Sequence, residues 1–304
     1  MHVVEVAEVG GPDVLRWVER PDPVAGPGQV VVWIAAANVN PTDLGARGGR
    51  YARGSVEPPY VLGWDFAGEV GSVGDGVSAL AAGDRVVGMI HWYDMEGTAG
   101  AYAEAVAADV GWLVELPEGL DPVLGATIPL NALTAVQGLE LLGLAPDSTI
   151  LVTGASGGVG TFAVQLAARA GHRVVALAGR DDEDWPRSLG ASVVLPRDAD
   201  LSAIEQVDAL FDAVPLGAAA APAVRDGGAI VTVRRTDEFD PGRGIHKQAF
   251  LIHPDQARLR ELVADVAAGR LQTRVARTIP LADAAEGHRL VEAGGLRGKV
   301  VLIP

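Results

Sequence analysis

Hydrophobic residues in the early part of the chain occur in short runs that Gly- and Pro-rich turns separate. The first two runs flank the turn Gly10-Gly11-Pro12-Asp13, and a longer run ends at Pro41. Short apolar runs with such boundaries are typical of antiparallel strands. We therefore predict a β-rich region with little helix up to about Pro117. The predicted strands are 1–10, 14–20, 29–40, 67–77, 84–91 and 101–117.

The pattern changes after Pro117. Residues 121–144 have apolar positions at helical spacing, interrupted by Pro129. From Ile150 onward, strand-like runs alternate with helical ones, which predicts a parallel sheet covered by helices on both faces. The predicted strands are 149–155, 173–179, 192–196, 209–214 and 227–235, and the helices are 158–171, 184–191 and 217–225.

The end of the chain changes character again. An amphipathic helix is predicted at 255–271, an extended segment at 273–281, a second helix at 282–294 and a closing strand at 299–304. We predict three stretches: a β-rich first part (1–117), a parallel α/β part (118–247) and a tail (248–304) that returns to the first part.

Composition and charge narrow the function. Apolar residues make up 49% of the 304 positions and charged residues 21%, which is usual for a globular enzyme. The net charge of −15 argues against nucleic-acid binding, because such proteins need a basic surface. No basic block, signal peptide or apolar run of the ~20 residues needed to cross a bilayer is present, so a soluble cytoplasmic protein is expected. The absence of cysteine excludes disulfides, thiolate metal sites and a cysteine nucleophile.

The segment 150–185 has the form of a dinucleotide-binding unit. Its turn reads Ala155-Ser156-Gly157-Gly158-Val159-Gly160, with Ala155 in the first glycine position of the G-x-G-x-x-G pattern. Gly157 lets a pyrophosphate approach the helix N-terminus, and Gly160 lets the helix pack on the strand. A glycine-rich turn also occurs in ordinary strand–helix connections, but the flanking strands and long helix favour a nucleotide site.

The end of the second strand indicates which cofactor binds. NAD-preferring sites usually have an acidic residue there, whereas this chain has Gly179 followed by Arg180. A small residue leaves room for a 2′-phosphate, and arginine can bind it through a forked contact. The acidic run Asp181–Asp184 would repel a phosphate if it pointed inward; its simpler interpretation is a solvated helix N-terminus. The interpretation is an NADPH site.

Seven motifs occur in the order found in one protein family. Together they resemble the zinc-free quinone oxidoreductase (zeta-crystallin-like) branch of the medium-chain dehydrogenase/reductase superfamily. The resemblance implies a GroES-like β-rich domain, a Rossmann doubly wound parallel sheet, and a C-terminal segment returning to the first domain. It also implies an active site in the cleft between the domains and a homodimer. The motifs are AAANVNPTDLGARGGRY (35–51), PPYVLGWDFAGEVGSVGDGVSALAAGDRVVG (58–88), GAYAEAV (100–106), PLNALTAVQGL (129–139), VTGASGGVG (152–160), LGASVV (189–194) and GKVVLIP (298–304).

The metal ligands of the zinc-dependent members of this superfamily are missing. Those members bind zinc with Cys and a Gly-His-Glu segment, where this chain has no Cys and reads Gly63-Trp64-Asp65. Trp64 cannot bind zinc, and the histidines are scattered without ligand spacing. Without a metal, hydride transfer is easier to an electron-poor acceptor, so a quinone or an α,β-unsaturated carbonyl is the expected substrate.

The resemblance also suggests residues of the active site. Asn40 and Asp43 match polar positions near the nicotinamide, although Asn-x-Asn-Pro-Thr-Asp also suits a strand end and a helix cap. Tyr51 matches a tyrosine that borders the substrate pocket, where it could hydrogen-bond the acceptor oxygen or simply pack. Trp64 is expected at the pocket. Gly45 stands where some relatives have a second tyrosine, so quinone specificity does not follow.

Two further residues match positions near the cofactor. Thr134, in the segment NALTA, matches a threonine that contacts the nicotinamide end, and Asn131 is its neighbour. The simple alternative for Asn131 is a polar residue that satisfies the backbone around Pro129.

Two other functions fit the same sequence. An enoyl-thioester reductase shares the fold and the hydride chemistry, although the acidic net charge does not favour binding of a long phosphorylated thioester arm. A crystallin-like protein that binds nucleotide without turnover is the second alternative.

Overall fold

The computed structural model describes residues 1–51, 54–234 and 239–304. The chain forms two compact units: unit 1 contains 1–130 and 253–304, and unit 2 contains 131–252. The predicted return of the C-terminal segment to the first domain is confirmed. The boundaries between the two units lie at 130/131 and 252/253 in the structure, whereas the sequence suggests 117/118 and 247/248. Residues after 117 join unit 1 because the short helix α2 (Pro122–Gly125) packs on its strands β3 and β5.

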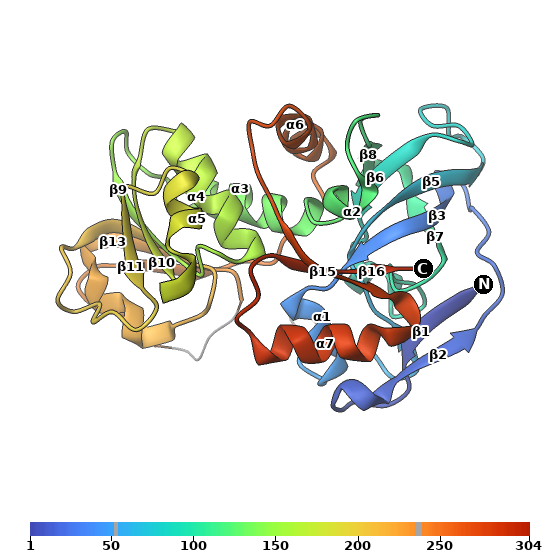
Figure 1. Ribbon diagram of the computed structural model, residues 1–304, viewed down its shortest axis with the longest axis horizontal. Helices are drawn as coiled ribbons and strands as arrows, with labels where there is room; N and C mark the ends of the chain where they lie inside the picture. Colours follow the sequence, from blue (N-terminus) through green and yellow to red (C-terminus); the bar gives the residue numbers. More distant parts are fainter. Residues whose placement is uncertain (52–53, 235–238) are drawn as a thin grey trace. The chain divides into compact units, whose positions relative to one another are not determined.

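Unit 1 is built around a mainly antiparallel sheet in the order β15-β16-β3-β5-β6-β8, with β7 also paired to β3. Helix α7 packs along β16 and β15 (Figure 1). The strands are β1 (His2–Val6), β2 (Leu15–Glu19), β3 (Gln29–Asn38), β4 (Tyr60–Val61), β5 (Asp65–Val73), β6 (Arg85–Met89), β7 (Ala105–Asp109), β8 (Leu113–Glu115), β15 (Val275–Pro280) and β16 (Lys299–Ile303). Besides α2, the helices are α1 (Pro41–Arg47), α6 (Gln256–Ala267) and α7 (Ala284–Ala293), with 3₁₀ turns η1 (Pro12–Val14), η2 (Trp92–Met95), η3 (Val110–Trp112) and η6 (Leu281–Asp283).

The register of this sheet brings four strand ends to one edge. Asn38, the last residue of β3, lies opposite Val301 of β16, and Asp65, the first residue of β5, lies opposite Met89 of β6. Because neighbouring strands run antiparallel, the ends of β3 and β6 and the starts of β5 and β16 meet there. This arrangement decides where the polar residues of unit 1 gather.

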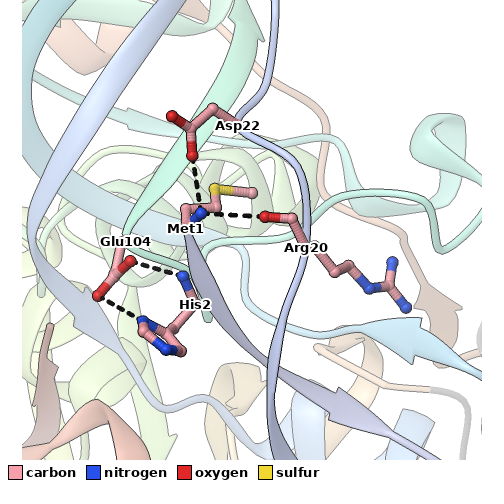
Figure 2. Close-up of polar contacts among 5 residues, drawn as sticks. All are labelled: Met1, His2, Arg20, Asp22 and Glu104. Carbon is pink, nitrogen blue, oxygen red and sulfur yellow. Dashed lines mark hydrogen bonds and ion pairs between the residues drawn. The ribbon is translucent and has the colours of Figure 1, made fainter.

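A smaller antiparallel sheet, β2-β1-β4, contains the beginning of the chain. Polar contacts hold the start of β1 (Figure 2): the Met1 amino group donates to the Asp22 carboxylate at 2.7 Å and to the Arg20 carbonyl at 3.0 Å. The backbone N–H of His2 donates to Glu104 at 2.5 Å, and this bond is the main reason that the pKa of Glu104 is lowered. The first two contacts hold the start of β1 to the segment after β2, and the third holds it to the residue before β7.

Unit 2 is a parallel sheet in the order β11-β10-β9-β12-β13-β14. This is the 3-2-1-4-5-6 order of the Rossmann fold, and the predicted fold class is confirmed. Helix α4 packs on β9 and β10 (Figure 1). The strands are β9 (Thr149–Thr153), β10 (Arg173–Ala178), β11 (Val193–Pro196), β12 (Val207–Asp212), β13 (Val224–Thr232) and β14 (His246–Ala249). The helices are α3 (Pro129–Leu142), which begins at the boundary with unit 1, α4 (Gly158–Arg169) and α5 (Asp184–Ser188), with 3₁₀ segments η4 (Arg180–Asp182) and η5 (Gly217–Ala223).

The structure differs from the sequence expectations in a few elements. Pro129 begins α3 instead of interrupting a longer helix, because proline is favoured in the first turn, where its missing N–H is not needed. Residues 217–223 form a 3₁₀ helix with Pro222 inside it. Strand β14 was not expected, since its residues HKQA lack an apolar pattern. Among the described residues, no helix is long and apolar enough to span a membrane.

Candidate active site

The glycine turn after β9 has the backbone that a dinucleotide site needs. Gly154 has φ +58°, a conformation that favours glycine, and it makes the sharp exit from the strand. The next residue, Ala155, is buried, and its N–H donates to the carbonyl of Leu177 in β10 at 3.0 Å. The residue that turns the backbone out of the strand is therefore Gly154, one position before Ala155, which stands in the first glycine position of the pattern.

Space around the turn explains the other glycines. A Cβ at Gly160 would lie 2.1 Å from the Gly154 carbonyl oxygen, so α4 can approach the strand only with glycine there. A Cβ at Gly157 would meet the same oxygen at 3.2 Å, and Gly157 is exposed at the start of α4. Gly158 and Val159 form the first turn of that helix, where backbone N–H groups have no partner within the helix.

Ser156 provides a second indication of a ligand at this turn. Its Oγ is buried and has no hydrogen-bond partner among the described residues. Buried hydroxyls normally have a partner, so an orphan beside a helix N-terminus fits an anionic ligand. The turn and its serine therefore suit the pyrophosphate of a dinucleotide.

Two arginines lie at the end of β10, where the sequence points to Gly179 and Arg180. Gly179 follows β10 and Arg197 follows the paired strand β11; a Cβ at Gly179 would lie 3.5 Å from the Arg197 Nη2. Arg180 donates from its Nη2 to both carboxylate oxygens of Asp198 at 3.0 Å. Both side chains of that pair are 68% exposed, so an anionic ligand can displace Asp198 at little cost.

The edge of the unit 1 sheet contains a buried polar cluster. One Asp65 oxygen accepts from Asn38 and Asn40 at 2.9 and 2.8 Å, and the other accepts from the Leu130 N–H at 2.8 Å. The Lys299 ammonium donates to Asn40 Oδ1 at 3.0 Å. Burial raises the pKa of Asp65 to about 6 and lowers the pKa of Lys299 to about 8. Asn38 Oδ1 is buried without a hydrogen-bond partner among the described residues.

A second chain of buried contacts starts at Asp43 on α1. Its Oδ2 accepts from the Asn40 N–H at 2.8 Å and from the Tyr102 hydroxyl at 3.4 Å. The first of these is the helix-cap contact that the sequence offered as the alternative to a catalytic role. Burial raises the pKa of Asp43 to about 7.

This series of buried contacts continues from Tyr102 to helix α7. His288 Nε2 lies 3.0 Å from the Tyr102 hydroxyl, and His288 Nδ1 lies 2.9 Å from Arg47 Nη1. Since arginine only donates, His288 Nδ1 accepts, and its proton resides on Nε2. Burial lowers the pKa of His288 to about 3, so the imidazole is neutral at ordinary pH. Arg47 also contacts the Glu292 carboxylate.

Aromatic side chains pack beside the polar cluster. Tyr51 stacks on Trp92 with ring centroids 6.4 Å apart, and Trp64 packs edge-to-face on Tyr93 and His91 at 5.5 and 6.1 Å. Trp64 itself is only 2% exposed.

The Tyr51 hydroxyl lies within 3.0 Å of both the Val56 carbonyl and the Tyr60 hydroxyl. Tyr60 donates its own proton to the Ala46 carbonyl, so its oxygen is an acceptor for Tyr51.

The remaining residues that the sequence selects lie on helices. Asn131 and Thr134 are buried near the start of α3, and both belong to unit 2. Gly45 lies on α1, where a Cβ would be 3.3 Å from the Arg50 carbonyl oxygen.

Sequence reasoning missed several members of these clusters. Asp65 was considered only as a replaced metal ligand, and Arg197 was not considered at all. Arg197 had a usable signal, because it follows its strand as Gly179 follows the neighbouring parallel strand. The partners at the sheet edge come from distant segments, and nothing local in the sequence marks them. The missed residues are Asn38, Arg47, Asp65, Tyr102, Arg197, His288 and Lys299.

Comparisons with known proteins agree with both units. Residues 26–118 match the alcohol dehydrogenase GroES-like domain family, and residues 189–302 match the zinc-binding dehydrogenase family. The chain is 30% identical to 2-methylene-furan-3-one reductase of Solanum lycopersicum, over 91% of this chain and 72% of that protein. The chain belongs to the medium-chain dehydrogenase/reductase superfamily. It is therefore an oxidoreductase that uses a nicotinamide cofactor.

Solved structures of the superfamily match the whole chain. The quinone oxidoreductase of Coxiella burnetii superposes with a TM-score of 0.91 at 29% identity, covering 100% of this chain and 99% of that one. An NAD-dependent alcohol dehydrogenase superposes with a TM-score of 0.87 at 31% identity, covering 100% of both chains. Membership of the superfamily thus leaves the choice between NAD and NADP to the residues of this chain.

Proposed function

We propose that this protein is a metal-independent, NADPH-dependent reductase of quinones or α,β-unsaturated carbonyls. The observation that carries the proposal is at Gly179, after the end of β10: the Arg197 Nη2 lies 3.5 Å from the position of a Cβ there, and Arg180 is the next residue. No side chain at Gly179 occupies the space that a ribose 2′-phosphate needs, and the two arginines supply charge and donors for it.

Each part of the cofactor has matching residues in unit 2. The pyrophosphate would be held by the backbone N–H groups at Gly158 and Val159 and by the Ser156 hydroxyl, which lacks another partner. Thr134 and Asn131 would contact the nicotinamide end. When bound, the cofactor supplies a hydride from its nicotinamide ring.

The residues at the strand edge do not suit a zinc ion. Trp64 stands where the zinc-dependent members have the histidine of the Gly-His-Glu segment, and tryptophan does not replace imidazole at zinc; no cysteine is present to supply a thiolate. The Lys299 ammonium, 3.0 Å from Asn40 Oδ1, would also repel a cation. Within the described residues, no group of three or more His, Cys, Asp or Glu side chains could hold a metal ion.

Without a Lewis acid, the acceptor must already be electron-poor, and quinones and enones meet this condition. Tyr51 would position it in unit 1, and Asn40 and Asp43, which are buried with partners inside the protein, would support the residues around it. The Tyr51 hydroxyl can turn from the Val56 carbonyl and donate its single proton to the acceptor oxygen, because Tyr60 keeps its own bond to the Ala46 carbonyl without that proton.

Trp64 is itself only 2% exposed and would border the site through the rings of Tyr93 and His91 that pack on it. Gly45 would let the Arg50 carbonyl approach α1, since a Cβ there would lie 3.3 Å from that oxygen.

A cytoplasmic homodimer completes the proposal. Strand β14 ends the unit 2 sheet, so its outer side can pair with the same strand of a second copy. Sedimentation equilibrium tests this part: a monomer at micromolar concentration would contradict it.

The test of the proposed function is an acceptor panel read by NADPH absorbance. It contains 1,4-benzoquinone, a naphthoquinone, a 2-alkenal, a cyclic enone and crotonyl thioester. We expect turnover with the quinones or the enones. Preference for the thioester would support an enoyl-thioester reductase, and cofactor binding without turnover on any acceptor would support a crystallin-like binding protein.

A further inference from the structure

His91 and Asp94 form a paired unit at the same strand edge that the proposed function does not yet use. His91 Nδ1 lies 2.5 Å from Asp94 Oδ2, and the Asp94 backbone N–H donates to the His91 carbonyl at 2.9 Å. A carboxylate fixes the proton on Nδ1, so Nε2 is the nitrogen that can exchange a proton with another molecule.

The position of this pair follows from the register of the sheet. His91 comes two residues after Met89, which lies opposite Asp65 in the β5–β6 pair. Between them, the Ile90 N–H donates to the Trp64 carbonyl at 2.8 Å. His91 therefore lies at the edge where β3 and β6 end, beside the first residue of the polar cluster.

The surroundings of His91 differ from those of the other titratable groups at this edge. Asp43, Asp65 and Tyr102 are fully buried, and each already forms hydrogen bonds inside the protein. The His91 side chain is 13% exposed and packs edge-to-face on the buried Trp64, which the proposed function places beside the substrate. A proton donor needs this combination: a fixed orientation, contact with the site, and access to water for reprotonation.

We infer that His91, oriented by Asp94, is the general acid that protonates the reduced acceptor. The inference rests on the proposed function. For an enone, a hydride adds to the β-carbon and the electron pair moves to the α-carbon and oxygen as an enolate. His91 acts in its doubly protonated form, in which Nδ1–H stays on Asp94. The Nε2–H bond breaks, its proton forms the new C–H bond at the α-carbon, and a neutral imidazole with its proton on Nδ1 remains. Water returns a proton to the imidazole, so each turnover consumes one hydride and one proton.

The test uses 2-methyl-2-cyclohexenone with NADPH, because protonation of its α-carbon creates a stereocentre. The wild type should form 2-methylcyclohexanone with a high enantiomeric excess. His91→Gln should lower kcat by about 100-fold, as loss of a general acid does, and should lower the enantiomeric excess, because solvent protonates both faces. Asp94→Asn should lower kcat less and Glu96→Gln, an exposed carboxylate in the same loop, should change neither quantity.

A second measurement does not depend on turnover. In ¹⁵N-histidine NMR spectra of the cofactor-free protein, the signal absent from His91→Gln identifies His91. It should report a proton on Nδ1 in the wild type, and this preference should weaken in Asp94→Asn.

The outcomes separate the two proposals. A His91→Gln variant with wild-type kcat and enantiomeric excess, or a neutral His91 protonated on Nε2, overturns this inference alone. A wild type that reduces quinones but not the enone also overturns it and leaves the proposed function standing. A wild type without turnover on any acceptor overturns both.

Discussion

Within unit 1, the carboxylate of Asp65 at the start of β5 accepts a hydrogen bond from the backbone N–H of Leu130 at 2.8 Å. Its other oxygen accepts from the Asn38 and Asn40 amide groups, so both terminal atoms of the residue 65 side chain must be hydrogen-bond acceptors.

Asp65→Asn should therefore destabilise the protein although it barely changes the volume. The new NH₂ group must face one of the existing N–H donors, leaving buried donors unpaired at a cost of about 2–4 kcal/mol in unfolding free energy. Urea unfolding checks this, with the exposed Glu118→Gln as the control. A loss below about 0.5 kcal/mol would contradict the assigned hydrogen bonds.

Asp43 makes stability depend on pH. Its pKa is raised from 3.8 to about 7 by burial, so the folded protein binds this proton more tightly than the unfolded chain. The unfolding free energy should then fall as pH rises from about 4 to about 7, by on the order of 2–4 kcal/mol. Asp43→Asn should remove this part of the dependence.

The measurement is urea unfolding of both proteins at pH values across that window. His288 contributes with the opposite sign. Its pKa is lowered from 6.5 to about 3 in the folded protein, so its contribution to the unfolding free energy is lost as pH falls below about 6.5. His288 is present in both proteins, so the difference between their curves isolates Asp43. Parallel curves would show that Asp43 does not titrate in this range.

Gly160 and Gly157 should respond differently to alanine. Gly160→Ala places a Cβ 2.1 Å from the Gly154 carbonyl oxygen, and neither backbone segment can move without opening the contact between α4 and β9. We expect a loss of about 3 kcal/mol or more in unfolding free energy. Gly157→Ala meets the same oxygen at 3.2 Å and should cost little stability.

Cofactor titration distinguishes the packing role of Gly160 from the cofactor-binding role proposed for Gly157. Gly157→Ala should weaken NADPH binding by about 10-fold while the protein stays folded, because its methyl group lies where the pyrophosphate would approach. Unchanged affinity in a folded Gly157→Ala variant would mean that the phosphates lie elsewhere.

Arg180 and Arg197 should set the preference for NADPH over NADH. Each Arg→Ala change should raise the Kd for NADPH by about 10-fold, the loss expected for a charge-assisted contact, and should leave the Kd for NADH within about twofold. Arg225→Ala is the control, because Arg225 forms an exposed pair with Asp208 on the same unit. Equal Kd values for both cofactors in the wild type would remove the NADPH assignment.

The sequence predicted the strand, glycine turn and helix after Thr149 well because their signal is local. A strand, a glycine turn and a helix occupy one continuous segment, and their geometry follows from the residues between Thr149 and Arg169. Even there, the residue with positive φ was Gly154 and not the motif position Ala155, since the chain must reverse as soon as β9 ends.

The polar cluster of unit 1 could not be predicted in this way. Asn40 and Asp43 were identified from a motif that also caps a helix, and the structure gives both residues cap contacts and buried partners. Their partners Tyr102, His288 and Lys299 lie far away in the sequence, and only strand pairing and helix packing bring them together.

By itself the sequence determined the two kinds of fold, the strand–turn–helix at Thr149–Arg169 and the absence of thiolate ligands, because short-range patterns and residue chemistry decide these properties. Tertiary structure decided which side chains share an environment. Antiparallel register placed Asp65 beside Asn38 and His91 beside Trp64, and parallel register placed Arg197 beside Gly179. Burial then moved the pKa values of Asp43, Asp65, His288 and Lys299, since desolvation depends on what surrounds a group and not on its neighbours in the sequence.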